Sequence, residues 1–439
     1  MIILATILSS VSLLMSVLLL IKTKNPIGWI TMIPKAIAGA LSPYCAIIGA
    51  AGAIIGAISG AYWAIPMGIF GAGMMIWYAW QCTRGHNGFE DAFGDNWKDQ
   101  IPPEQARHMV KRRWSPYLKM KASPDSNCER DLPFWTVPGA DRQLLCDLWR
   151  PAEGNVSGLA FIYYHGSGWA VFDKDLCTRP FFRHLVSQGH TVMDVAYRLC
   201  PEVDIHGMIA DVKHAVAWMK VNASRYGVNP EKIVLGGGSA GAHLALLAAY
   251  TPRHPALTPE ELKGIDLSVC GVISYYGPTD MLAVYQHANL QKLEDQPTVP
   301  IGTKVDSIKA FNYAARFDLL LGGWPQDVPD MYTLASPISH VQPGCPPTLL
   351  IQGNQDFITS VDASCALHKK LVESGVPAIN VVYPWTDHGF DMLLPQTSPP
   401  IQSSLYDVDR FLALLLNTDQ NLYQYQEESQ DVREKLHPS

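Results

Sequence analysis

The chain has 439 residues and a formal net charge of −7 at neutral pH, without a long basic run. This acidic balance is not that of a nucleic-acid-binding protein, so no nucleic-acid partner is expected. The nine cysteines are scattered without C-x-x-C spacing, and the sequence contains no cluster of metal-ligating residues. Neither a disulfide framework nor a metal site is therefore predicted.

The N-terminal part is strongly apolar. Residues 1–21 carry no charged side chain and are long enough to cross a bilayer core as a helix. Three lysines follow, and residues 36–81 then contain no Asp, Glu, Lys or Arg, which is enough for two more spans that turn near residues 60–63. Glycine recurs every four residues along 52–60, a spacing that lets membrane helices approach closely. We expect residues 1–81 to form about three transmembrane helices of a multi-pass integral membrane protein.

Two alternatives to this membrane region remain. Residues 1–21 could be a cleaved signal peptide, and residues 36–81 could be a buried apolar hairpin. The first apolar run lacks the positively charged stretch of a signal peptide, and further spans follow it, which favours the lipid bilayer as a partner.

Charge predicts the orientation of the spans. Lys22, Lys24 and Lys35 precede the second span, and residues 111–113 (Lys-Arg-Arg) follow the third, so all these cations lie on one side. Because positive residues favour the cytoplasmic side, we expect the domain that follows the spans to face the cytosol, with residues 111–113 as a solvated or lipid-headgroup-facing patch. Glycosylation sequons at 155–157 and 222–224 favour a lumenal domain instead, and this alternative stays open.

The remaining chain alternates between strand-like and helix-like segments. Residues 82–130 are a polar connector with helical segments, which we expect to form part of a cap. Residues 134–150 resemble a β-hairpin, and regularly spaced apolar strands and amphipathic helices follow it. Residues 131–418 are therefore predicted to form an α/β domain, with a mostly parallel sheet covered by helices on both faces.

The first strand after the hairpin ends in a glycine-rich turn, His165-Gly166-Ser167-Gly168-Trp169. In acyl transfer a negatively charged tetrahedral oxygen forms, and backbone N–H groups in such a loop are its simplest donors. An ordinary turn after a strand is the alternative, so the assignment depends on a nucleophile elsewhere in the chain.

A serine in a second glycine-rich turn supplies that nucleophile. The pattern Gly-x-Ser-x-Gly spans 237–241, after the apolar run 232–235 and before the alanine-rich stretch 242–250. A nucleophile elbow needs this context, because its tight strand-to-helix turn accepts only small flanking residues. We predict that Ser239 is the nucleophile and that the amides of Ser167, Gly168 and Ala240 form an oxyanion hole.

A serine nucleophile needs a histidine base, and the histidine needs a carboxylate to orient it. Asp356 follows an apolar strand, and His388 follows the next one, in the chain order Ser, acid, His that is typical of α/β-hydrolases. Ends of strands are also where open α/β sheets place their chemistry. Asp387 is a rival acid, but it is adjacent to His388 in sequence, and we expect it to point elsewhere.

One insertion interrupts the alternation. Residues 281–336 are long and contain several aromatic side chains, and we expect them to form the second half of a cap that shapes the acyl pocket. A surface insertion without function is the alternative. Residues 419–439 are polar and charged and are expected to form a loose tail.

Several separated motifs together resemble the hormone-sensitive-lipase group of α/β-hydrolases, which includes arylacetamide-deacetylase-like enzymes. Residues 165–169 match the family's HGGGW, residues 197–202 (Tyr-Arg-Leu-Cys-Pro-Glu) match YRLAPE, and residues 237–241 match GDSAG. The segments 352–356 and 387–390 fit the acid and base segments. The resemblance covers roughly residues 130–415 and implies a Ser/Asp/His hydrolase of carboxylic esters that needs no cofactor. Two departures are Gly238 for the family's Asp and Ser167 for a glycine.

These features together predict a membrane-anchored serine carboxylesterase of lipase type, with lipophilic esters as substrates, including acetylated hydrophobic metabolites. An amidase or peptidase with the same triad is one alternative. A non-catalytic small-molecule receptor on the same fold is another, although such receptors lack the triad histidine that His388 supplies here.

Overall fold

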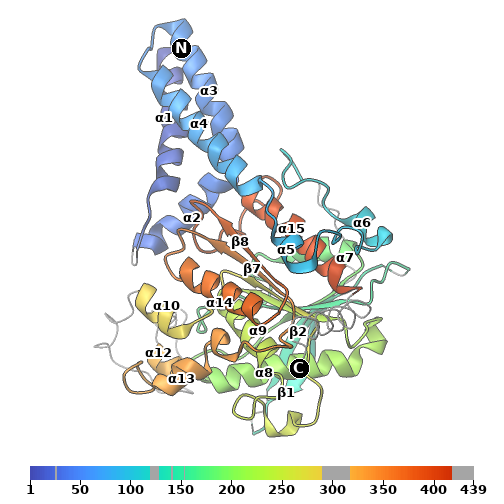
Figure 1. Cartoon of the computed structure of the whole chain (residues 1–439). Helices are drawn as coiled ribbons and strands as arrows, with labels where there is room; N and C mark the ends of the chain where they lie inside the picture. The colour runs from blue at the N-terminus through green and yellow to red at the C-terminus, as the bar shows by residue number, and fades with distance from the viewer. Residues whose placement is uncertain (25–26, 119–127, 140–141, 153, 289–316, 418–439) are drawn as a thin grey trace, which may run out of the picture.

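The computed structural model describes residues 1–24, 27–118, 128–139, 142–152, 154–288 and 317–417. Figure 1 shows a long helical bundle that projects from an α/β domain, with the N-terminus at the far end of the bundle. The N-terminal helices are α1 (Ile2–Leu20), α2 (Ile27–Ala40), α3 (Ser42–Ser59) and α4 (Ala64–Thr83).

Small residues allow α1, α3 and α4 to pack closely. A Cβ added to Gly52 would lie 2.5 Å from the Ser9 hydroxyl oxygen, and one added to Gly49 would lie 2.4 Å from that of Ser12. Large apolar side chains such as Ile54 and Ile58 instead point outward, 62% and 76% exposed. The turn near residues 60–63 lies between α3 and α4, as predicted.

Of the described helices, α1 and α3 are long and apolar enough to cross a membrane, whereas α4 is less hydropathic. Two such helices are weak evidence, because a signal sequence or a buried core helix has the same properties. The arrangement of three spans therefore stays a prediction.

Helix α2 differs from the expectation for residues 22–35, whose lysines were predicted to lie between two spans at the membrane surface. Instead these residues include most of a helix that crosses the base of the bundle and packs on the α/β domain. Lys35 is accordingly buried rather than facing solvent. The physical reason is an acidic partner, Asp387, which lies more than 350 residues away in sequence and could not be paired with Lys35 from local pattern.

The α/β domain contains the predicted mostly parallel sheet. Its eight strands are ordered β1-β2-β4-β3-β5-β6-β7-β8; β1–β2 and β2–β4 pair antiparallel, and the other neighbours pair parallel. The strands are β1 (Cys128–Thr136), β2 (Gln143–Trp149), β3 (Ala160–Tyr164), β4 (Thr191–Val195), β5 (Ile233–Gly238), β6 (Gly271–Tyr275), β7 (Thr348–Gly353) and β8 (Ala378–Tyr383). The central strands are apolar on both sides because helices cover both faces.

The helices that follow the bundle are α5 (Gly88–Phe93), α6 (Pro103–His108), α7 (Arg179–Ser187), α8 (Ile205–Asn222), α9 (Ala240–Tyr250), α10 (Met281–His287), α12 (Phe317–Leu321), α13 (Pro329–Leu334), α14 (Val361–Glu373) and α15 (Pro399–Leu415). Helices α8, α9 and α14 pack on one face of the sheet, and α7 and α15 pack on the other.

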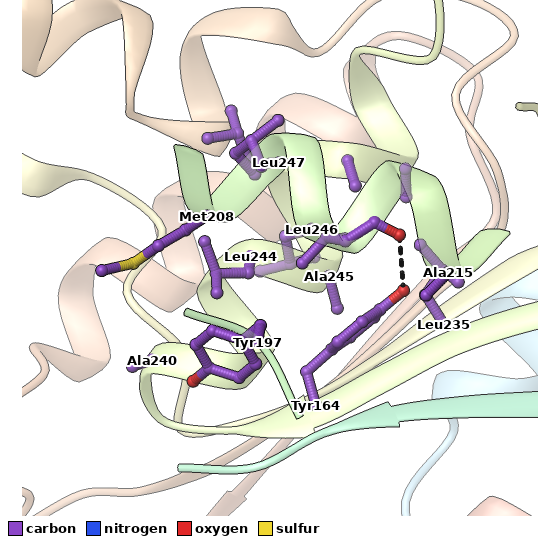
Figure 2. Close-up of a cluster of buried hydrophobic side chains, with 14 of the residues drawn as sticks. Tyr164, Tyr197, Met208, Ala215, Leu235, Ala240, Leu244, Ala245, Leu246 and Leu247 are labelled. Atoms are coloured by element: carbon purple, nitrogen blue, oxygen red, sulfur yellow. Dashed lines mark hydrogen bonds between the residues drawn. The ribbon is translucent and has the colours of Figure 1, made fainter. Parts of the chain in front are cut away.

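Helix α9 is the central helix of the core. All of its residues are buried, and Figure 2 shows Leu244 and Leu246 among other apolar side chains next to Tyr164 of β3. The Tyr164 hydroxyl donates a hydrogen bond to the Val212 carbonyl of α8 at 3.1 Å. This packing fixes the position of Ala240, the first residue of α9, at the end of β5.

The connector packs differently from the prediction. Among its described residues, Arg113 forms an ion pair with Asp407 of α15 at 2.7 Å, and the Val110 amide donates to Asp409 at 2.7 Å. None of the described residues 82–118 lines the cavity at the active site, and a cap role of the connector stays a prediction. Residues 289–316 of the predicted cap, Ala140 of the hairpin turn, and the tail from 419 onward lie outside the described residues.

Candidate active site

Ser239 lies in a strained turn between β5 and α9, with a positive backbone φ of 52°. A Cβ added to Gly241 would lie 2.0 Å from the Tyr164 carbonyl oxygen, and one added to Gly237 would lie 2.5 Å from the same atom. Only glycine fits at both positions, because the turn presses against the end of β3. The geometry is that of a nucleophile elbow, in which the serine stands out from the sheet.

The residues predicted as acid and base meet this serine. His388, after β8, places Nε2 at 2.9 Å from Ser239 Oγ, and its Nδ1 lies 2.7 Å from Asp356 Oδ2, after β7. Burial disfavours the charged imidazole, but the Asp356 carboxylate outweighs this effect, so the pKa of His388 is raised above its usual value. Three residues spread over 150 positions thus form one hydrogen-bonded chain at the carboxyl ends of parallel strands.

Both carboxylate oxygens of Asp356 accept hydrogen bonds from neighbouring residues. Its Oδ1 accepts hydrogen bonds from the amides of Ile358 and Thr359, both at 2.8 Å. Its Oδ2 accepts from the Thr359 hydroxyl at 2.8 Å and from Gln352 Nε2 at 3.1 Å. These donors stabilise the ionised carboxylate and fix its orientation toward His388.

The rival acid points away from the histidine ring. Asp387 Oδ2 forms an ion pair with Lys35 at 3.0 Å, and its Oδ1 accepts from the His388 backbone amide at 2.9 Å. Asp387 therefore contacts the backbone of the catalytic loop and not the imidazole.

The glycine-rich loop after β3 lies beside the elbow. A Cβ added to Gly166 would lie 3.6 Å from Ser239 Cβ, so the two turns are in contact. The Ser167 hydroxyl is 2.8 Å from the Tyr197 hydroxyl and accepts from the Trp169 amide at 2.9 Å. The serine that replaces the family's glycine therefore stabilises the loop.

The predicted oxyanion donors have amides available for a ligand. Within the described part of the chain, the amides of Ser167, Gly168 and Ala240 donate to no protein acceptor. Ala240 begins α9, and the first amides of a helix have no acceptor within it. The other two motif residues have structural contacts: His165 stacks on Tyr197, and the Trp169 indole N–H donates to His243 at 3.1 Å.

A second polar cluster was not predicted. A Cβ added to Gly238 would lie 3.2 Å from the Tyr276 hydroxyl and 3.4 Å from that of Tyr163, which occupy the space of a larger side chain. The Tyr276 hydroxyl donates to Asp391, and burial raises the pKa of that carboxyl. The glycine in place of the family's Asp at 238 was the only sequence signal for this cluster.

Ser239 and His388 open into a cavity of about 480 Å³. Most of its wall is apolar. The described part of the insertion contributes Val284, Ala288 and Phe317 to the wall, and its role as a cap stays a prediction. Helix α2 contributes four wall residues that were not predicted, namely Trp29, Ile30, Met32 and Ile33. Among the described residues, no group of three or more His, Cys, Asp or Glu side chains could hold a metal ion.

The sheet order, the elbow and the hydrogen-bonded Ser-His-Asp chain define an α/β-hydrolase. The family described as BD-FAE matches residues 146–371, more than half of the chain, and the protein belongs to this family of α/β-hydrolases.

Comparison with known proteins shows the same class. Esterase LipQ of Mycobacterium tuberculosis (strain ATCC 25618 / H37Rv) is 27% identical over 342 residues, which cover 75% of each chain. Versiconal hemiacetal acetate esterase of Dothistroma septosporum (strain NZE10 / CBS 128990) is 27% identical over 62% of this chain and 83% of its own. Probable carboxylic ester hydrolase LipM of the same Mycobacterium strain is 29% identical, but only 53% of its length is covered.

Among solved structures, a thermophilic esterase from Thermogutta terrifontis superimposes with a TM-score of 0.51 at 22% identity, over 66% of this chain and 95% of its own. This likeness shows the fold. Together with the curated relatives, it establishes the protein as a carboxylic ester hydrolase of the α/β-hydrolase fold.

Proposed function

We propose that the protein is a membrane-anchored serine carboxylesterase of lipophilic esters, with Ser239 as nucleophile, His388 as general base and Asp356 as the orienting acid. The observation that carries this proposal is the continuous hydrogen-bonded chain from Ser239 Oγ through His388 to Asp356, at 2.9 and 2.7 Å, at the base of an apolar cavity.

In the acylation step, Ser239 Oγ attacks the ester carbonyl carbon while His388 Nε2 takes the hydroxyl proton. Asp356 keeps the other imidazole proton on Nδ1 and stabilises the imidazolium that forms. The negatively charged carbonyl oxygen accepts hydrogen bonds from the amides of Ser167, Gly168 and Ala240, which are preorganised by the two turns. When the tetrahedral intermediate collapses, His388 returns its proton to the leaving alcohol.

Deacylation uses the same groups in the second half of the cycle. A water molecule attacks the acyl-enzyme carbonyl while His388 removes its proton, and the imidazolium then protonates Ser239 as the carboxylic acid leaves. Both halves require a neutral imidazole at the start.

The cavity wall supports lipophilic substrates. Trp29 and Phe317 present apolar surface to the cavity, and Ile30 and Phe172 line it while remaining 76% and 56% exposed at its opening. A substrate with a long acyl chain or a hydrophobic alcohol would bury this surface. The name of the Dothistroma relative, an acetate esterase of versiconal hemiacetal, supports acetylated hydrophobic metabolites as a candidate class.

The helical bundle supports membrane anchoring. Its outward face is apolar, and α1 and α3 are long enough to span the bilayer core. In Figure 1 the N-terminus lies at the end of the bundle away from the α/β domain, so the end of α1, with Lys22 and Lys24, lies at the domain side. With α1, α3 and α4 as spans, these lysines favour a cytosolic domain, whereas glycosylation at Asn155 or Asn222 would show a lumenal one.

The proposal is tested by fluorophosphonate labelling of membranes that contain the wild type or Ser239→Ala, beside hydrolysis of p-nitrophenyl acetate, butyrate and longer esters. We expect labelling and hydrolysis only in the wild type, and the dependence on chain length separates a deacetylase from a lipase. A matched pair of ester and amide substrates distinguishes an amidase. A folded wild type in the membrane that is not labelled would refute the proposed mechanism.

A further inference from the structure

Lys35 is a buried cation at the junction between the N-terminal helices and the catalytic loops. Its side chain is 1% exposed, and its partner Asp387 is 3% exposed. Besides Asp387 Oδ2 at 3.0 Å, the ammonium contacts Gln355 Oε1 at 3.4 Å and Thr23 Oγ1 at 3.3 Å. A buried charge is retained at such a site only when its partners compensate for lost hydration.

Two of these partners directly precede the proposed triad residues. Gln355 is the neighbour of Asp356, and Asp387 is the neighbour of His388. The Asp387 carboxylate also accepts from the His388 amide at 2.9 Å and from the Phe357 amide at 3.3 Å. The Lys35 ammonium thus contacts both the loop that carries Asp356 and the loop that carries His388. The Asp387 carboxylate accepts hydrogen bonds from backbone amides of both loops.

The rest of α2 packs on the same two loops. Trp29 makes an edge-to-face contact with Phe357, with ring centroids 5.2 Å apart, and a Cβ added to Gly28 would lie 2.4 Å from the Phe357 ring. A Cβ added to Gly389, next to His388, would lie 3.7 Å from Met32 Sδ. The helix therefore covers both loops, in addition to forming part of the cavity wall.

We propose that Lys35 is a positioning residue for ester hydrolysis: its ammonium holds the loop that carries Asp356 against the loop that carries His388, so that catalysis depends on the docking of helix α2. The inference rests on the proposed triad. In this arrangement the N-terminal region contributes to the geometry of the active site, in addition to its proposed role as an anchor.

The physical basis is the sensitivity of catalysis to geometry, since a shift of about 1 Å in a catalytic group can cost about 10²-fold in rate. Without Lys35, the buried Asp387 carboxylate has no compensating cation and must move toward water, take up a proton or repel Asp356. Each of these responses alters the hydrogen bond from the His388 amide to Asp387 or the electrostatic environment of the Asp356–His388 pair.

The test compares Lys35→Met, Lys35→Arg, the double variant K35M/D387N and the control Lys24→Met in the full-length membrane protein. Lys24 is exposed and lies in the same N-terminal region, after the end of α1. The maximal rate of p-nitrophenyl butyrate hydrolysis is divided by the number of active sites, titrated with fluorophosphonate to its end point, to give kcat per site, and KM is measured in the same assay. A residue that only supports folding changes the number of sites, whereas a positioning residue changes kcat for each site.

We expect Lys35→Met to lower kcat per site by about 10- to 100-fold, with KM changed less than about threefold. Lys35→Arg should recover part of kcat, because a cation is restored. The double variant should be faster than K35M, because no uncompensated carboxylate remains. Lys24→Met should match the wild type.

A Lys35→Met variant with the wild-type kcat per site would overturn the inference. If Lys35→Met yields no folded protein, the test uses the double variant K35M/D387N, which buries no unpaired charge. A kcat per site of the double variant within about twofold of the wild type then overturns the inference. Failure of the proposed function is recognised separately, because the wild type would then not be labelled at Ser239.

Discussion

The role of Asp356 can be separated from that of a general negative charge by the substitution Asp356→Asn. The side-chain oxygen that accepts from the Ile358 and Thr359 amides, both at 2.8 Å, keeps these partners in the variant. The other position becomes an NH2 group, which faces His388 Nδ1 at 2.7 Å and can only donate. The imidazole must then carry its proton on Nε2, which faces Ser239, and it cannot accept the hydroxyl proton.

The expected loss in kcat is about 10⁴-fold, equivalent to about 5.5 kcal/mol of transition-state stabilisation, because the imidazole has the wrong tautomer. The Gln352 amide, which donates to Oδ2 in the wild type, also loses its acceptor. The assay is hydrolysis of p-nitrophenyl butyrate by purified enzyme in detergent, with circular dichroism to show that the variant is folded. Asp362→Asn, at an exposed position near the start of α14, is the matched control.

A folded Asp356→Asn variant that keeps more than about a tenth of the wild-type kcat would refute the assignment of Asp356 as the orienting acid. In that event Asp387 and Asp391, whose charges also act on His388, would have to be reconsidered.

Two further predictions concern the base and the elbow. His388 must be neutral to accept a proton, and its pKa is raised by Asp356, with further contributions from Asp387 and Asp391. The value of kcat/KM should therefore fall as the pH decreases through a midpoint above 6.5. A midpoint below this value in the pH profile would contradict the raised pKa of His388. Gly241→Ala should lower the free energy of unfolding by about 3 kcal/mol or more, because the new Cβ would lie 2.0 Å from the Tyr164 carbonyl oxygen. Thermal unfolding measures this effect, with Gly73→Ala as the control, since nothing lies within 4 Å of its Cβ; equal melting temperatures of the two variants would argue against the close packing of the elbow.

The replacement of the family's Asp at position 238 has a structural counterpart. Tyr163 and Tyr276 fill the space next to Gly238, and the Tyr276 hydroxyl donates a hydrogen bond to Asp391 in the loop after β8. The polar environment behind the nucleophile is therefore supplied by side chains from β3, from the end of β6 and from the loop after β8. Substitution of one residue in the motif did not remove the nucleophile elbow, because the elbow depends on Gly237 and Gly241 and not on position 238.

The sequence by itself determined the alternating β/α order, the elbow at Ser239 and the residues that meet there. These are local signals: a buried strand is a short apolar run, and a tight turn requires glycine wherever a Cβ would meet backbone, as at Gly237 and Gly241. The chain order of the α/β-hydrolase triad then selected Asp356 and His388 among many carboxylates and 14 histidines.

Only the tertiary structure decided where α2, the connector and α15 lie. Lys35 looked like one of several lysines beside a membrane span, and its burial against Asp387 depends on a contact between opposite ends of the chain. The connector packs on α15 through Arg113 and Asp407, and among the described residues α2, and not 82–118, contributes to the cavity wall. A local sequence pattern predicts that a charged side chain is exposed, because charged residues are rarely buried without a partner. The opposite charge that stabilises Lys35 in the interior is brought close only when the chain folds.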